Sequence, residues 1–269
     1  MTSQRMLALG LTVASALTLL NAAQFGQGMR RSAAYEREMQ NPAEDPPDAY
    51  QEAEFAFARL RYRSPQRSRG RGSWGTDSNK AERQFVRGVR RLTRIHARSV
   101  EEIIDVDSDE IFNWPWIYAV EVGHWQLSDS QAKRLRDYLD RGGFLMVDDF
   151  HGSYEWSVFL EGLRKVFPER PVVEVANEDE IFHVLYDLSE RVQVPGFQYV
   201  RSGRTYEQDG VQPRWLAIFD QRGRVQVAIC HNMDLGDAWE WADDPRYPER
   251  FASLAYRIGI NYIVYPMTH

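Results

Sequence analysis

The stretch RGGFLMVDDFHG, residues 141–152, decides the fold class. A Gly-Gly pair is typical of a helix end, because glycine adopts the left-handed conformation that closes the last helical turn. The apolar run FLMV at residues 144–147 indicates a strand buried on both faces, as in parallel sheets. Asp148, Asp149 and His151 follow that run. The stretch therefore predicts a helix, a central strand, and polar side chains at the carboxyl end of the strand.

Strand and helix patterns alternate on both sides of this stretch. Apolar runs predict strands over residues 54–62, 100–106, 116–122 and 172–175. Helical spacing and capping residues predict helices over residues 79–97, 128–141, 154–167, 178–185 and 249–262. Residues 214–219 and 224–230 flank a turn and predict an antiparallel hairpin. We therefore expect an α/β fold: a Rossmann-like, mainly parallel sheet flanked by helices, with a C-terminal antiparallel hairpin extension.

Residues 1–23 have the pattern of a signal peptide or an N-terminal anchor. One basic residue precedes an apolar run over residues 6–20, and small residues come before a polar stretch. Residues 24–53 are polar and contain prolines, which predicts a flexible tether. Residues 54–269 then form a single α/β domain. We expect export, with the domain in the periplasm or cell envelope and membrane contact only through an uncleaved N-terminal segment.

The net charge of −6 is unevenly distributed along the chain. Residues 59–98 carry 12 Arg and one Lys against two acidic residues, whereas residues 99–269 carry 16 basic and 30 acidic residues. A basic strip on an acidic body either pairs with the body's own carboxylates or binds an anion. Export and the lack of a nucleic-acid-binding motif argue against a nucleic-acid partner. The single cysteine, Cys230, excludes an intramolecular disulfide and a thiolate metal cluster.

Polar residues follow three of the expected strands directly. They are His124, then Asp148, Asp149 and His151, then His231, Asn232 and Asp234. Ligands of open α/β sheets bind at the carboxyl ends of the strands, so we expect these side chains around one cleft. Asp148, Asp149, His151 and His231 are the candidate catalytic residues, as acid/base groups or metal ligands. The competing interpretation is that the aspartates cap helices and brace loops. No cofactor is identified, and a divalent metal is left open.

A second set of residues is a candidate for ligand binding. Arg61 and Arg63 alternate along the first expected strand, and Trp74 lies among glycines that allow close approach of the backbone. Arg201 and Arg204 offer a further anion contact. His124, Asn232 and Asp234 complete this set. The alternative for the arginines is a solvated or ion-paired surface.

Four separated segments carry a family resemblance. They are GSWGTD at residues 72–77, DEIFNWPWIYAVEVGHW at 109–125, RGGFLMVDDFHG at 141–152 and CHNMDLGDAWEWADDPRYP at 230–248. Together they resemble the bacterial domain-of-unknown-function family 4159 over residues 54–269. A more distant similarity is to the trehalose-utilisation-like and class I glutamine-amidotransferase-like folds, which implies a flavodoxin-like sheet. Amidotransferases carry a cysteine after a central strand, where this chain has Asp148 and Asp149, so amidotransferase chemistry is not expected.

The sequence favours a binding function over a reaction. We expect an extracytoplasmic module that holds a ligand or partner in a polar cleft at the C-terminal edge of the sheet, because no motif specifies a reaction. The partner would be an anionic or sugar-like small molecule, or an envelope protein. The alternative is a hydrolase-type enzyme that uses the Asp/His cluster, with or without a metal. A structural envelope component without a pocket is the third hypothesis.

Overall fold

The computed structural model describes residues 45–64 and 74–269. The expected export segment and most of the tether lie outside these residues, as do Arg67, Arg69 and Arg71 of the basic strip. Within the described ranges, no helix combines the length and the apolar character needed to cross a bilayer.

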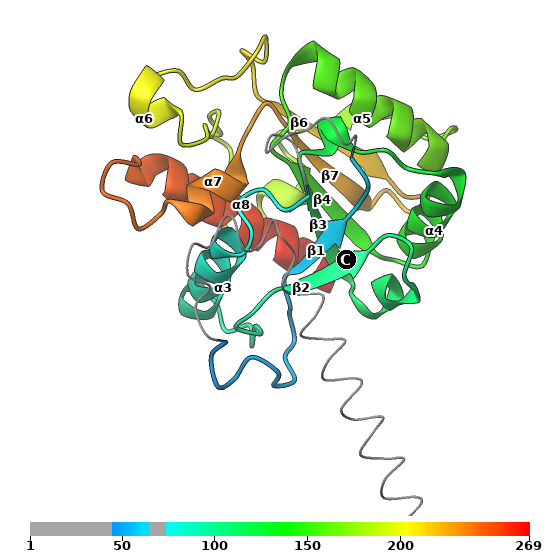
Figure 1. Ribbon diagram of the computed structural model, residues 1–269, viewed down its shortest axis with the longest axis horizontal. Coiled ribbons are helices and arrows are strands. Elements are labelled where there is room, and N and C mark those ends of the chain that lie inside the picture. The colour runs from blue at the N-terminus through cyan, green and yellow to red at the C-terminus, as the bar shows by residue number, and fades with distance from the viewer. Residues whose placement is uncertain (1–44, 65–73) are drawn as a thin grey trace, which may run out of the picture.

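Seven strands form one sheet in the order β2-β1-β3-β4-β7-β6-β5 (Figure 1). Their bounds are Ala58–Arg61 (β1), Glu102–Asp105 (β2), Trp116–Val120 (β3), Phe144–Asp148 (β4), Val173–Glu174 (β5), Arg214–Phe219 (β6) and Val225–His231 (β7). Strands β2, β1, β3, β4 and β7 pair in parallel, and β6 pairs antiparallel with β7 and β5. The five parallel strands follow the flavodoxin-like order. The predicted parallel core and antiparallel hairpin are therefore confirmed.

Helices cover both faces of the sheet (Figure 1). The helices are Lys80–Leu92 (α3), Asp129–Asp140 (α4), Gly152–Val166 (α5), Tyr199–Ser202 (α6), Leu235–Glu240 (α7) and Glu249–Thr268 (α8). Short 3-10 turns occur at Asp109–Asn113, Val122–His124 and Glu180–Phe182. Side chains of α4 and α5 share a core with one face of the sheet, and those of α3, α7 and α8 share a core with the other.

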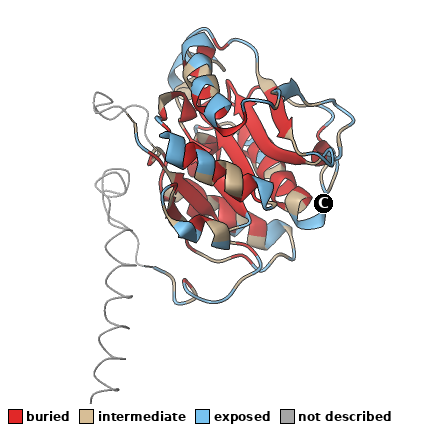
Figure 2. Cartoon of the chain, turned by 90° about the vertical axis from the view of Figure 1, so that its right-hand side faces the viewer, coloured by how far each residue is buried: buried red, intermediate tan, exposed pale blue. Residues whose placement is uncertain are grey.

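The central strands are buried on both faces, which is why they are almost continuously apolar. Along β3, Ile117 and Ala119 join the core under α4 and α5, whereas Trp116 and Tyr118 join the core under α3, α7 and α8. Figure 2 shows this buried sheet between layers of helices whose outer sides are exposed. Polar groups therefore concentrate at the ends of the strands, where the chain turns.

Several predicted boundaries are confirmed and others are wrong. Ser128 and Gln131 form the predicted capping box of α4. The predicted capping box of α3 does not form: Asn79 makes no side-chain capping bond, and the Glu82 side chain forms an ion pair with Arg59. That helix ends at Leu92, earlier than predicted. Only a 3-10 turn forms in the expected helix over residues 178–185, and α8 extends beyond its predicted end.

Candidate functional site

Strained turns gather at the carboxyl edge of the parallel strands. The residues Glu121, Asp149 and Asn232 follow β3, β4 and β7, and their φ angles are 55°, 51° and 64°. Asp77, in the segment that follows β1, has a φ of 61°. The left-handed conformation is uncommon for residues other than glycine and costs on the order of 1 kcal/mol or more. Such outliers cluster at functional sites, so they indicate a functional site at this edge.

Asp148 is a fully buried carboxyl at the end of β4. Its Oδ2 accepts hydrogen bonds from the Tyr118 hydroxyl at 3.1 Å, from Leu235 N at 2.7 Å and from Gly236 N at 3.1 Å. Its Oδ1 is buried and has no hydrogen-bond partner among the described residues. Burial raises the pKa of Asp148 to about 7, against the effect of the three hydrogen bonds. One oxygen therefore caps α7, and the other is left unsatisfied.

Asp149 lies on the turn between β4 and α5. Its backbone N–H donates to Met233 O at 3.1 Å, and its Oδ1 lies 3.1 Å from His151 Nε2. Burial, and then the negative charge of Glu121, raises the pKa of Asp149 well above its usual range. Burial lowers the pKa of His151 to about 3. His151 is therefore neutral near pH 7, and its hydrogen bond supplies Asp149 with no positive charge.

Asp234 and Asp237 belong to the start of α7. Asp234 is the N-cap residue, and its Oδ1 accepts from Asp237 N at 2.7 Å. The two oxygens of Asp237 accept from Phe197 N at 2.6 Å and from Trp241 Nε1 at 3.1 Å. Burial, and then the charge of Asp149, raises the pKa of Asp234. Asp234 therefore serves as a cap while it faces other carboxylates.

The buried Arg59 positions the segment that carries Asp77. Its guanidinium forms an ion pair with Glu82 of α3 and donates to Trp74 O at 2.9 Å and Thr76 O at 2.8 Å. Asp77 is 3% exposed and comes directly after Thr76 in the chain. The first half of α3 and the end of β1 thus hold Asp77 against the sheet edge.

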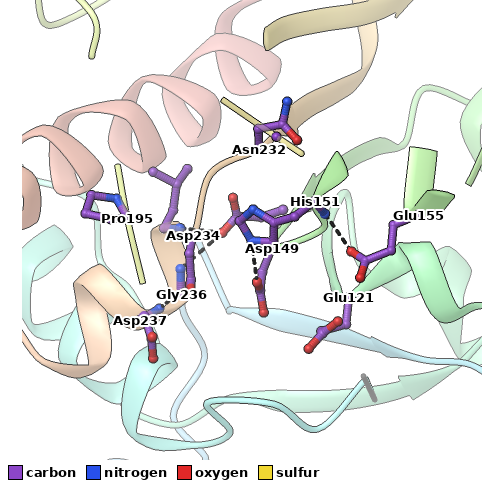
Figure 3. A network of polar contacts seen from close by, with 12 residues as sticks. Glu121, Asp149, His151, Glu155, Pro195, Asn232, Asp234, Gly236 and Asp237 are labelled. Carbon is purple, nitrogen blue, oxygen red and sulfur yellow. Dashed lines mark hydrogen bonds and ion pairs between the residues drawn. The ribbon is translucent and has the colours of Figure 1, made fainter. Parts of the chain in front are cut away.

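Asp77, Asp149 and Asp234 converge on one point. One carboxylate oxygen from each lies within 4.8 Å of the others. The three residues are 3%, 6% and 4% exposed. Figure 3 shows Asp149, just after β4, and Asp234, at the N-cap of α7, turned toward the same region, with Asp237 beside them. This buried group, here called the aspartate cluster, is an accumulation of negative charge that folding alone does not favour.

Glu121, His124 and Glu155 form a second, more accessible group at the same edge. Figure 3 shows Glu121 and Glu155 of this group. His124 Nδ1 lies 3.1 Å from Glu121 Oε2, and its Nε2 lies 3.8 Å from Glu155 Oε1. The Glu121 carboxylate beside its ring raises the pKa of His124. Glu155 also accepts from His151 N at 2.5 Å, so it links this group to the turn after β4.

His231 and Asn232 brace the opposite side of that turn. The His231 ring packs on Phe150 and Trp156, with ring centroids 4.8 Å away in both cases. Its Nε2 lies 3.2 Å from Gly152 O, and burial lowers its pKa to about 4. Asn232 Oδ1 accepts from Gly152 N at 2.8 Å. Both side chains therefore support the first turn of α5.

A cavity of about 540 Å³ opens beside β1 and β2 at the carboxyl edge. Its lining residues include Arg61, Arg63, Trp74, Asp105, Asp107 and Gln131. The Arg61 guanidinium pairs with both carboxylate oxygens of Asp105 and lies 5.6 Å from the centroid of the Trp74 ring. Asp107 accepts from Gln131 Nε2 at 2.7 Å.

A smaller cavity of about 380 Å³ lies beside His124. Tyr154, Glu161 and Lys165 of α5 form its outer wall. The structure thus brings two cavities and the aspartate cluster to one edge of the sheet. Arg201 and Arg204 are both exposed, on α6 and just after it, and Arg204 lies over the Tyr206 ring at 5.7 Å. Neither arginine lines either of these cavities.

The four segments that carry the family resemblance contribute residues to this edge. Asp77 ends the first, Glu121 and His124 lie in the second, Asp149 in the third and Asp234 in the fourth. The family model for DUF4159, a domain of unknown function, matches residues 56–267. The chain belongs to the DUF4159 family. No curated protein matches the chain. The resemblance to trehalose-utilisation-like and amidotransferase-like folds stays a prediction.

Several residues at the carboxyl edge of this DUF4159 domain were not predicted from the sequence. Asp77, Glu121 and Glu155 belong to its charged groups, and Asp105 and Asp107 line the larger cavity. Asp77 and Glu121 lie within the family segments, Asp105 lies near the end of the strand predicted over residues 100–106, and Asp107 follows that strand, so their positions carried a signal. Glu155 carried none, because a glutamate in the first turn of a helix is ordinary.

Proposed function

We propose that this domain is an extracytoplasmic module that binds a small, neutral, oxygen-rich molecule of the saccharide class at the carboxyl edge of its sheet. The observation that carries the proposal is the 540 Å³ cavity with the Trp74 indole in its wall. This volume lies within the usual range for small-molecule sites, roughly 300–1,000 Å³. Aromatic rings beside planar hydrogen-bonding side chains suit a ligand with both apolar and hydroxyl-bearing faces.

The charges of the cavity favour a neutral ligand over an anion. Arg61 is neutralised by its paired carboxylate, Asp105. Arg63 and Asp107 add one charge of each sign to the lining. Among the described lining residues the four formal charges therefore cancel, so this part of the wall offers hydrogen bonds to a neutral ligand.

The alternative function, a hydrolase, is supported by Asp149 on a strained strand-to-helix turn within 3.1 Å of His151. Sharp turns of this kind present nucleophiles in other α/β enzymes. General-base catalysis near neutral pH requires a group with a pKa close to 7. Burial lowers the pKa of His151 to about 3 and that of His231 to about 4, so both are weak bases. Asp148 has a pKa of about 7, but it is fully buried and its Oδ2 accepts three hydrogen bonds. Binding is therefore the function that the geometry favours.

Calorimetric titration of the full-length protein tests the proposal. The probes are glucose, N-acetylglucosamine and maltose, with inorganic phosphate as the anionic comparison. We expect at least one saccharide to bind and Trp74→Ala to weaken that binding about tenfold, the order of one lost aromatic contact. Trp114→Ala is the matched control, because Trp114 also carries an arginine, Arg98, over its ring at 5.1 Å but precedes β3.

Asp105→Asn gives a second, opposite readout. This change leaves the Arg61 guanidinium without its paired charge, so phosphate binding should strengthen while saccharide binding weakens. The proposal fails if wild-type protein binds phosphate in preference to all three saccharides. It also fails if no saccharide binds, or if Trp74→Ala and Trp114→Ala weaken binding equally.

A further inference from the structure

We propose that Asp77, Asp149 and Asp234 form a binding site for one divalent cation that prefers oxygen ligands, of the Ca²⁺, Mg²⁺ or Mn²⁺ type. The proposal goes beyond saccharide binding and does not depend on it. One carboxylate oxygen from each residue lies within 4.8 Å of the other two. Two ligands of a Ca²⁺ ion, each 2.3–2.6 Å from the metal, are at most roughly 5 Å apart. The separations between the three oxygens are thus within the span of two ligands of one Ca²⁺ ion.

The buried Oδ1 of Asp148 is an independent observation that points to a missing partner. Asp148 is fully buried, and no hydrogen-bond donor among the described residues reaches this atom. Its other oxygen accepts from Gly236 N, and a Cβ atom on Gly236 would lie only 2.5 Å from Asp77 Oδ2 and 3.6 Å from Asp234 Oδ1. The Asp148 carboxyl therefore lies next to the cluster, where a water molecule bound to the cation would satisfy it.

The surrounding side chains do not neutralise the cluster. The charged and titratable groups that act on Asp149 or Asp234 most strongly are carboxylates: Asp77, Glu121, Asp148, Asp237, and each other. Arg59, the buried cation that acts on Asp77, forms an ion pair with Glu82. A divalent cation supplies the positive charge that these buried carboxylates lack.

Two neighbouring sets of possible ligands fit a cation less well. Asp77, Asp237 and Glu240 also converge, but both oxygens of Asp237 already accept hydrogen bonds. Glu121, His124 and Glu155 include a nitrogen ligand that is held by Glu121 at 3.1 Å. The aspartate cluster offers only oxygen ligands, and its three residues come from the segments that follow β1, β4 and β7. We therefore assign the cation to Asp77, Asp149 and Asp234.

Asparagine substitutions at the three positions remove the carboxylate and keep the backbone conformation. Asn tolerates the left-handed conformation of Asp77 and Asp149, and it is a good N-cap in place of Asp234. Asp149→Asn should therefore fold, and its melting temperature without metal should equal or exceed that of the wild type, because the amide keeps the backbone conformation and removes a carboxyl group that is costly to ionise when buried. A residue that served only as a structural brace would lower that temperature when changed.

The experiment is calorimetric titration of chelator-treated full-length protein with CaCl₂, MgCl₂ and MnCl₂, with melting temperatures measured in parallel. We expect one ion per chain for at least one metal, a metal-dependent rise in melting temperature, and at least a tenfold loss of affinity in Asp149→Asn and Asp234→Asn. Asp209→Asn is the matched control. It removes a carboxylate outside the cluster and should alter affinity less than twofold. The proposal is overturned if no metal binds the wild type. It is also overturned if both cluster variants bind like the wild type, or if His124→Gln abolishes binding while they do not.

Discussion

Asp148 and Asp234 each give one carboxylate oxygen to the start of α7. Asp148 accepts from two backbone N–H groups of that helix, and Asp234 accepts from a third. These bonds explain why two acidic residues are tolerated in a buried turn, because capping offsets part of the cost of burying them. The capping interpretation and the site interpretation of these aspartates are therefore compatible, since each carboxylate has a second oxygen.

The buried imidazole of His231 predicts a pH-dependent stability. Its pKa in the folded protein is about 4, whereas the unfolded chain binds the proton near pH 6.5. The folded state is therefore favoured above pH 6.5, and stability is lost as pH falls from 6.5 toward 4, by roughly 3 kcal/mol in all. Urea unfolding of wild type and His231→Gln across this range measures the effect.

Glutamine keeps a hydrogen-bond donor for Gly152 O but does not titrate. The difference in unfolding free energy between variant and wild type should therefore change with pH, with the variant relatively more stable at pH 4 than at pH 7. A difference that stays constant across the range would mean that His231 does not exchange a proton on unfolding.

At the scale of the elements, Arg59 joins three pieces of the fold. Its guanidinium connects β1 to Glu82 of α3 and to two carbonyls just before Asp77. Breaking a buried pair by removing one partner leaves an uncompensated charge, so Arg59→Met should lower the unfolding free energy by about 3–5 kcal/mol. Arg61→Met is the control, because the pair of Arg61 with Asp105 is 23% and 36% exposed and should contribute about 1 kcal/mol or less.

A double-mutant cycle separates the ion pair from the other bonds of Arg59. The combined change Arg59→Met and Glu82→Leu leaves neither charge in the core, so it should be less destabilising than the sum of the two single changes by 1 kcal/mol or more. Additive losses in urea unfolding would show that the pair has no coupling and that Arg59 acts only through the carbonyls.

The elements with strong local signals were predictable from sequence. The predictions are confirmed for the Ser128 capping box, the apolar strands β3 and β4, and the hairpin β6–β7. Each of these features depends on residues that are close together in the sequence. The failed prediction of a capping box at Asn79 and Glu82 has a long-range cause. Arg59 lies 23 residues from Glu82, and no local pattern predicts that their side chains meet.

The candidate site was predictable only in part. Residues after β3, β4 and β7 were found because parallel strands bring their carboxyl ends together. Asp77 was not singled out, because its place depends on the connection between β1 and α3 and on the hold of Arg59 on that connection. The described part of the basic strip is ion-paired only in part: Arg83, Arg90 and Arg98 contact Asp45, Asp48 and Glu102, whereas Arg87, Arg91 and Arg94 are exposed.

At the scale of the whole molecule, the location of the protein is itself a prediction. The apolar run over residues 6–20 and the polar stretch after it should direct export. A reporter active only outside the cytoplasm, fused after Gly28, should be active, and replacing two leucines of the run with arginine should abolish that activity. Equal activity of both fusions, or recovery of intact full-length protein from the soluble cytoplasm, would contradict export.

The central claim is that the carboxyl edge of the sheet, and not the opposite edge, binds the ligand. The opposite edge has the larger cavity, about 940 Å³, where Arg141, Arg222 and Arg224 gather with acidic residues before β4 and β7. Size alone would favour that cavity. The combination of strained turns, an aromatic wall and buried carboxylates favours the carboxyl edge instead.

Hydrogen–deuterium exchange of the full-length protein with and without a saturating saccharide compares the two edges in one measurement. The account predicts slower exchange over residues 61–64, 74–77 and 105–108, which line or border the 540 Å³ cavity, and no change over residues 140–143 and 220–224. Slower exchange confined to residues 140–143 and 220–224, or none at the carboxyl edge with any of the three saccharides, would contradict it.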